Sequence, residues 1–190
     1  MTDNYSFKET FSNINFSQEG FCAGEFECCV FETCDFSFLD LRECHFESCE
    51  FIDCDLSNAN LSGASFQEII FRDCKMLGLQ FNDCTGFAFS ADFDNCRLDH
   101  ASFYKIDLRS CSFEHCHLED VDFSETNLKK VNILACELKD ARFDHTNLEK
   151  ADLRASKNYL IDPENNRIQG AKFSIQNISG LLAKYDIKIY

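Results

Sequence analysis

Several residue types are scarce in this chain of 190 residues: tryptophan is absent, proline occurs once and glycine seven times. The chain is therefore poor in the usual turn residues. No apolar run approaches the roughly 18–20 residues of a membrane-spanning helix. The N-terminus lacks the basic start and apolar segment of a signal peptide. We therefore expect a cytoplasmic protein without membrane association, in which thiols stay reduced.

Basic residues are also few. The 18 Lys and Arg are outnumbered by 33 Asp and Glu, which gives a formal net charge of −15. This balance argues against direct binding to nucleic acid and to anionic membranes, since both favour Lys and Arg. It is consistent with a basic partner, or with solubility alone. Hydrophobic residues make up 45% of the chain, so a sizeable core is expected.

Large apolar residues recur at every fifth position, a period that neither a helix nor a strand explains. The pattern holds from Phe11 to Phe81, then resumes at Phe93 and continues to Leu153. The twelve residues from Phe81 to Phe93 are two periods plus two residues. The sequence therefore predicts a repeat array with a two-residue insertion between 85 and 92.

A four-sided arrangement is indicated by the cysteines. If each coil has four sides of five residues, six cysteines occupy the same position in successive coils, two residues before the central residue of the second side. The spacing of this cysteine column along the chain indicates the same two-residue insertion. Phe51 is then expected between Phe31 and Phe71, and Ser57 is expected on the surface. The column comprises Cys34, Cys54, Cys74, Cys96, Cys116 and Cys136.

The repeat resembles that of the pentapeptide-repeat family, as in "CDLSN", "ANLSG", "VDFSE" and "ADLRA". The resemblance implies an all-β fold, a right-handed quadrilateral β-helix with one pentapeptide on each side. Coils would stack at the ~4.8 Å strand spacing and bury their cores against their neighbours. We expect the β-helix over residues 1–156, with a small loop at 85–92. Residues 157–190 are expected to form a C-terminal module with a short helix and a terminal strand.

The inward cysteines are interpreted as small core residues. Disulfide formation and zinc binding are the alternative roles. Stacked side chains ~4.8 Å apart are wider than the ~3.8 Å Cβ spacing of a disulfide. The spacing of Cys44, Cys49 and Cys54 follows from the five-residue period, so we do not assign a zinc site to them. Cys22 and Cys28 fall at outward positions, without an assigned role.

Signals for an enzyme are missing. All five histidines fall at outward positions on different sides, and no glycine-rich phosphate loop is present. We predict no catalytic, cofactor-binding or metal-binding residues.

Acidic residues concentrate on the first side, which is the side that contains Phe51. The formal charges at the outward positions of this side sum to −6, against −4, −3 and −2 for the other three sides. The first side is therefore predicted to bind a basic partner. The alternative is that charged faces only keep the solenoid soluble. The candidate residues are Glu32, Glu50, Asp53, Asp73, Asp92, Asp94 and Glu114.

The insertion offers a second candidate contact. A loop on a rigid scaffold often carries binding, and the candidates here are Thr85, Phe87, Phe89 and Ser90. The alternative is a bulge whose aromatic residues fold back onto the coil.

The C-terminal segment "SIQNISGLLAKYDIKIY" predicts a helix capped by Ser174 and then a strand, "YDIKIY". The open end of a β-helix must be covered. We predict a two-fold dimer, with a monomer end cap as the alternative. The expected interface residues are Ile178, Leu181, Leu182, Tyr185, Ile187, Ile189 and Tyr190.

The segment "FRDCKMLGLQF" and the last 33 residues, Asn158–Tyr190, resemble the topoisomerase-poison resistance branch of the family. This branch includes the Qnr, albicidin-resistance and microcin-immunity proteins. The chain lacks the longer loops of the plasmid Qnr members and is more similar to the albicidin and microcin types. The resemblance implies DNA gyrase or topoisomerase IV as partner, with the acidic rod mimicking DNA. A rod of about 36 Å with this charge has about one charge per 2.4 Å, against ~1.7 Å for duplex DNA. The competing hypothesis is a regulatory scaffold with another protein partner.

Overall fold

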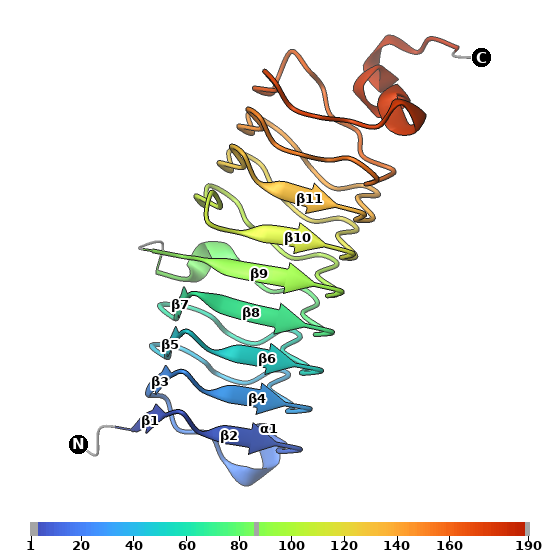
Figure 1. Cartoon of the computed structure of the whole chain (residues 1–190). Coiled ribbons are helices and arrows are strands. Elements are labelled where there is room, and N and C mark those ends of the chain that lie inside the picture. The colour runs from blue at the N-terminus through green and yellow to red at the C-terminus, as the bar shows by residue number, and fades with distance from the viewer. Residues whose placement is uncertain (1–3, 86–87, 189–190) are drawn as a thin grey trace.

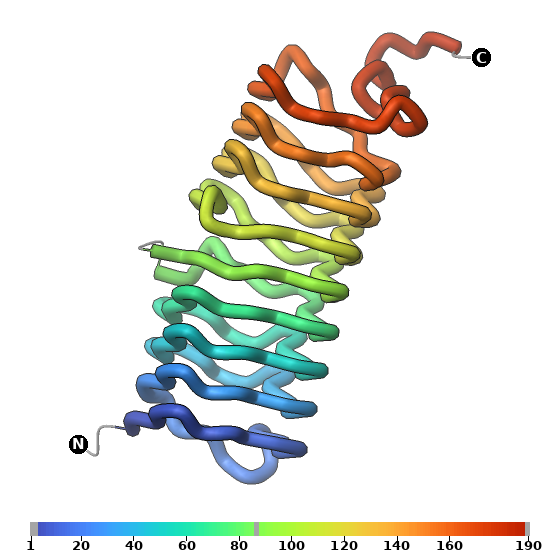
Figure 2. Tube along the Cα trace, in the orientation of Figure 1, coloured from blue at the N-terminus to red at the C-terminus, as the bar shows by residue number. Residues whose placement is uncertain are grey.

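The five-residue period produces a rod of stacked, four-sided coils. In the computed structural model, which describes residues 4–85 and 88–188, each coil lies directly on the previous one (Figures 1 and 2). Phe31, Phe51 and Phe71 occupy equivalent positions in neighbouring strands, as the period predicts. The predicted quadrilateral β-helix is confirmed.

Two parallel sheets run along adjacent sides of the rod (Figure 1). The four-stranded sheet, called sheet A here, contains β1 (Tyr5–Phe7), β3 (Glu25–Glu27), β5 (His45–Glu47) and β7 (Ser65–Gln67). The seven-stranded sheet, sheet B, contains β2 (Thr10–Ser12), β4 (Val30–Glu32), β6 (Glu50–Ile52), β8 (Ile69–Arg72), β9 (Ala91–Asp94), β10 (Ser112–Glu114) and β11 (Asn132–Leu134).

The other two sides are joined by single parallel bridges rather than by full strands. One such column runs from Asn15 through Asp35 and Asp55 to Lys157. Bridges continue past the last strand to Lys172, so the coils extend to that residue. The remaining elements are the one-turn helix α1 (Phe16–Glu19) and three 3₁₀ helices, η1 (Phe81–Asp83), η2 (Ile175–Leu181) and η3 (Ala183–Tyr185).

The core is a set of aromatic stacks that follow the rod axis. Phe31 and Phe51 have ring centroids 4.8 Å apart and nearly parallel planes, and Phe51 and Phe71 are 5.0 Å apart. Phe46 meets Phe51 edge-on from the neighbouring side at 5.4 Å. Both arrangements are favourable for aromatic rings. The ring spacing equals the strand spacing, so hydrogen bonding and core packing reinforce each other.

The cysteines fill the core and also form hydrogen bonds. All 13 are free thiols. In the predicted column each thiol approaches the carbonyl oxygen of the central residue one coil earlier, as Cys54 Sγ does with Phe31 O at 3.3 Å. Ser156 and Thr126 donate to equivalent carbonyls at 2.7 Å. Burial raises the pKa of Cys49 to about 12, so this thiol stays protonated.

The corners of the coils require an unusual backbone. In the described chain, 26 non-glycine residues have positive φ, and most lie two positions after a central residue. Asp53 has φ 53° and Phe38 has φ 56°. Such residues cost of the order of 1 kcal/mol each. Hydrogen bonds to the next coil, such as Asp53 N to Arg72 O at 2.9 Å, offset this cost.

Ser57 differs from the expectation. It points outward but is only 4% exposed, and its hydroxyl accepts from the backbone N–H of Leu77 at 3.3 Å. The prediction of an exposed side chain was wrong, because a short hydroxyl group close to the backbone is covered by the adjacent coil.

Replacing Phe51 by Ala should lower the free energy of unfolding by about 3–5 kcal/mol, because the ring is fully buried between two others. The exposed Ser62 is a suitable control, and Ser62→Ala should change stability by less than about 0.5 kcal/mol. Chemical denaturation followed by circular dichroism measures both. Equal midpoints for the two variants would contradict the assigned core.

Candidate partner-binding surface

Charge is distributed unevenly along the rod axis, a feature that counting by sides misses. Residues 1–84 contain 16 Asp and Glu against 4 Lys and Arg, a balance of −12. Residues 85–190 contain 17 against 14, a balance of −3. A count of charge in the two halves of the sequence would have found this asymmetry. The N-terminal half therefore carries most of the net charge.

In the C-terminal half, opposite charges contact each other from coil to coil. Lys129 Nζ lies 2.8 Å from Glu149, which also pairs with Arg167. Asp152 is 5% exposed and pairs with Arg154 and Lys172. The Arg154 guanidinium, helped by the Lys172 ammonium, lowers the pKa of Asp152 to about 2. Asp152 therefore adds little to an acidic surface, although it lies at an outward position of the first side.

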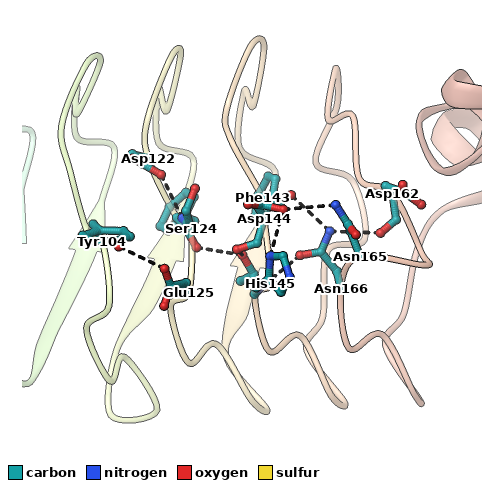
Figure 3. A network of polar contacts seen from close by, with 12 residues as sticks. Tyr104, Asp122, Ser124, Glu125, Phe143, Asp144, His145, Asp162, Asn165 and Asn166 are labelled. Carbon is teal, nitrogen blue, oxygen red and sulfur yellow. Dashed lines mark hydrogen bonds and ion pairs between the residues drawn. The ribbon is translucent and has the colours of Figure 1, made fainter.

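Uncharged groups in this half are also joined between coils (Figure 3). Tyr104 donates its hydroxyl to Glu125 at 2.9 Å. Asn165 donates to Asp144 at 3.1 Å, and Asn166 donates to the carbonyl oxygen of Phe143 at 3.1 Å. Much of the outward polar surface in this half is therefore engaged within the protein itself.

In the N-terminal half, like charges are stacked. Glu27 and Glu47 are paired in register in sheet A, and Asp35 and Asp55 are bridged on another side. Like charges directly opposite one another destabilise a sheet by several tenths of a kcal/mol. The described residues of this half contain three Lys or Arg ion pairs, those of Arg42, Arg72 and Lys75. In the other half, sheet B also holds one like-charge pair in register, Asp94 and Glu114, but there most carboxylates have a cation as neighbour.

The predicted acidic side is the outer surface of sheet B and its corner. Its candidates Glu32, Asp53, Asp73, Asp92 and Asp94 are exposed, whereas Glu50 and Glu114 are half-buried.

Several of these groups have neighbours within the rod. Glu50 pairs with Arg72 at 2.8 Å, and Asp73 accepts from Asn95 at 2.6 Å. The half-buried Val30, Ile52 and Ile70 lie on the same surface. The strands of sheet B thus bring the predicted residues onto one side but interleave them with aliphatic ones.

The insertion follows η1 and leads into β9. Phe89 is 5% exposed and packs edge-on against Phe66 and Phe81, so a partner cannot reach its ring. Ser90 is half-buried, and its hydroxyl accepts from the backbone N–H of Glu68 at 2.7 Å. Thr85 is exposed, and Phe87 lies outside the described residues. For Phe89 the folded-back alternative is the one observed.

The C-terminal module differs from the predicted helix and strand. Ser174 precedes η2, but its hydroxyl accepts from the side chain of Asn177 rather than capping the backbone. Residues 183–188 contain η3 and no strand. Lys184 instead binds Asp162 and Glu164, and these contacts hold the segment against the preceding turn.

The predicted interface residues of this module are placed unequally. Leu181 is 9% exposed and belongs to the chain's own core, while Ile178 and Leu182 are half-buried. Tyr185 and Ile187 are 50% and 56% exposed, and Ile189 and Tyr190 lie outside the described residues. Leu160 and Ile175, which the sequence interpretation omitted, are 56% and 81% exposed.

No group of residues suited to hold a metal ion occurs within the described chain. Among the described helices, none is both long and apolar enough to cross a membrane.

Comparison with known families agrees with the stacked repeat. The model of the pentapeptide repeat region matches residues 24–91, 44–123 and 87–158, together more than half of the chain. The chain belongs to the pentapeptide-repeat family. A comparison with curated protein sequences found no match.

Solved structures resemble this pentapeptide-repeat protein in fold. One trypsin-treated form of QnrB1, a plasmid-mediated fluoroquinolone resistance protein, has a TM-score of 0.63 at 22% identity, with 100% of both chains covered. A second such form has a TM-score of 0.56 at 22% identity, covering 99% of this chain and 98% of the other. At this level of identity the likeness shows a shared fold.

The uneven charge of this pentapeptide-repeat protein predicts substitutions of opposite effect. Glu47→Gln should stabilise the protein by several tenths of a kcal/mol, because it relieves repulsion with Glu27. Glu149→Gln should destabilise it by a similar amount, because Glu149 lies between Lys129 and Arg167. Thermal melting at low salt measures both effects, and added salt should shrink them. A loss of stability in Glu47→Gln would show that the stacked carboxylates do not repel.

Proposed function

We propose that this protein binds a bacterial type II topoisomerase, DNA gyrase foremost and topoisomerase IV as a second target. In binding, it protects the enzyme from poisons such as quinolones, albicidin or microcin. The resemblance of its repeats and C-terminal segment to the poison-resistance branch supports the choice of partner. The shared fold with QnrB1 is consistent with it.

The observation that carries the proposal is the charge density of the N-terminal half. Residues 1–84 fill about four coils, or about 19 Å at the strand spacing. Their balance of −12 therefore corresponds to about one charge per 1.6 Å, and duplex DNA has one per ~1.7 Å. The charge density averaged over the whole rod is lower, because it includes the C-terminal half, in which positive and negative charges nearly balance. A positively charged DNA path would meet in this half a charge density close to that of its natural ligand.

The mechanism follows from rigidity and charge. Stacked coils hold the carboxylates at fixed spacing, so little ordering entropy is lost when a partner binds. Occupation of the DNA path by the rod would compete with the DNA segment that a poison traps. No residue of the rod needs to take part in covalent chemistry.

The test is a gyrase supercoiling assay with and without a quinolone, albicidin or microcin. Asp53→Lys with Asp73→Lys should abolish protection, because both residues are exposed corner carboxylates of the acidic half. Asp120→Lys with Asp140→Lys is the matched control, with the same corner geometry and charge change in the compensated half. The control should keep most of the protection.

Three results are decisive for this proposal. Full protection by a folded Asp53/Asp73 variant would exclude DNA mimicry through the predicted acidic side. An equal loss of gyrase protection in both double variants would show that protection depends only on the net charge of the protein. An unmodified protein that neither binds gyrase nor relieves any poison would favour the regulatory scaffold with another partner.

We also propose that the protein acts as a homodimer joined through its C-terminal module. Exposed Leu160, Ile175, Tyr185 and Ile187 gather at this end of the rod and support the proposal. Leu181 is unsuitable as a probe because it packs within its own chain.

A double substitution tests the dimer. Leu160→Asp with Ile187→Asp should give a folded monomer at micromolar concentration, because charges would enter an apolar contact without partners. Ser62→Asp, an exposed site in the other half, should leave the dimer intact. Sedimentation velocity reports the mass. An unmodified protein that sediments as a monomer would leave the module as an end cap only.

A further inference from the structure

Sheet A presents an outer face that neither the repeat pattern nor the predicted acidic side singled out. We call its outward residues face A. They alternate with buried central residues along β1, β3, β5 and β7, which stack beside sheet B in the N-terminal half (Figure 1). Face A comprises Tyr5, Phe7, Glu25, Glu27, His45, Glu47, Ser65 and Gln67.

Two aromatic rings lie open at one end of this face. Tyr5 is 53% exposed and Phe7 is 44% exposed, and their rings are nearly parallel. The Lys8 ammonium lies 4.8 Å from the centroid of Phe7, so a cation already contacts this ring system. Cations bind favourably to the faces of aromatic rings.

Carboxylates follow the rings on the next two strands. Glu25, Glu27 and Glu47 form no ion pair with any described residue of the chain. Glu27 accepts a hydrogen bond from the Tyr5 hydroxyl at 2.7 Å, and this contact raises the pKa of Tyr5 to about 12. The phenol therefore stays neutral at physiological pH and fixes the Glu27 carboxylate next to the ring.

A shallow depression of about 290 Å³ lies on face A. Tyr5, Glu25, Glu27, His45 and Glu47 line it, together with Ser65 and Gln67. An aromatic wall and several carboxylates thus surround one small hollow. The same combination would suit a planar cation, which can stack on a ring while it donates to a carboxylate.

We propose that face A is a docking surface for a partner protein, which places an arginine side chain, or a lysine in its place, in this depression. The proposal deepens the proposed function, since it names the contact chemistry of a basic protein partner. The stacked coils hold Glu27 and Glu47 in register, and no cation of the described chain pairs with either carboxylate. A bound guanidinium would supply the missing positive charge and would cover the exposed rings.

A labelled nine-residue oligoarginine peptide tests the surface by fluorescence anisotropy on the full-length protein. Glu25→Gln with Glu47→Gln should weaken binding about tenfold, a change of about 1.4 kcal/mol. Asp35→Asn with Asp55→Asn is the matched control, because it removes two charges from the coils of Glu25 and Glu47 on another side. The control should weaken binding by less than about threefold.

A second variant tests the aromatic part. Tyr5→Leu with Phe7→Leu keeps the apolar character but removes the ring faces, and it should weaken binding about threefold or more. Circular dichroism confirms folding. If this variant does not fold, the two acidic variants decide the question.

Three outcomes would overturn the proposal: equal losses in the two acidic variants, unchanged binding in the folded aromatic variant, or displacement of the peptide by spermine at equal charge. The last would mark a surface for small polycations rather than for protein.

Gyrase protection separates this inference from the proposed function. If the Glu25/Glu47 variant loses the peptide but still protects gyrase, face A is not the gyrase contact. If peptide binding maps to face A but gyrase is not bound, the docking surface stands and the proposed partner is wrong.

Discussion

The structure depends on the coincidence of two repeat distances. Backbone hydrogen bonds set neighbouring coils about 4.8 Å apart, and the aromatic rings inside the rod stack at nearly the same distance, as between Phe31 and Phe51. Each coil therefore satisfies its backbone and its core against the same neighbours. Contacts between coils far apart on the axis are not needed, so stability accumulates coil by coil. This also explains why the chain can use positive φ at so many corners, because most of these strained residues donate a hydrogen bond to the adjacent coil.

Much of this architecture can be predicted from the sequence because it is periodic. The fifth-residue pattern identified the central residues, and the cysteine column identified the four sides and the inserted pair of residues. The β8–β9 register, which aligns Phe71 with Phe93, confirms that insertion. The pattern was a poorer guide to the burial and contacts of side chains wherever these depend on the neighbouring coil. Ser57 occupies an outward position yet is covered, and the core thiols approach carbonyl oxygens as well as filling space.

The candidate surface was predicted only in part, for a related reason. Counting charge by sides treats every coil as equivalent, but Glu149 and Glu47 differ in what lies one coil away. Glu149 has two cations as neighbours, and Glu47 has another carboxylate. The C-terminal module lies outside the repeat, so local patterns alone guided its interpretation. Lys184 and Tyr185 bind acidic groups of the preceding turn, and these contacts between distant residues replaced the expected strand.

The two-residue insertion before β9 has a consequence for how any partner aligns with the rod. A perfect repeat looks the same after a translation of one coil, so a partner that reads only spacing and charge could bind in several shifted positions of similar energy. The insertion interrupts that translational symmetry near the middle of the rod, where Phe89 replaces the regular central residue and Ser90 holds the backbone of Glu68. A partner whose shape matches this irregularity would bind in one register. The insertion thus provides one fixed reference position along an otherwise uniform repeat.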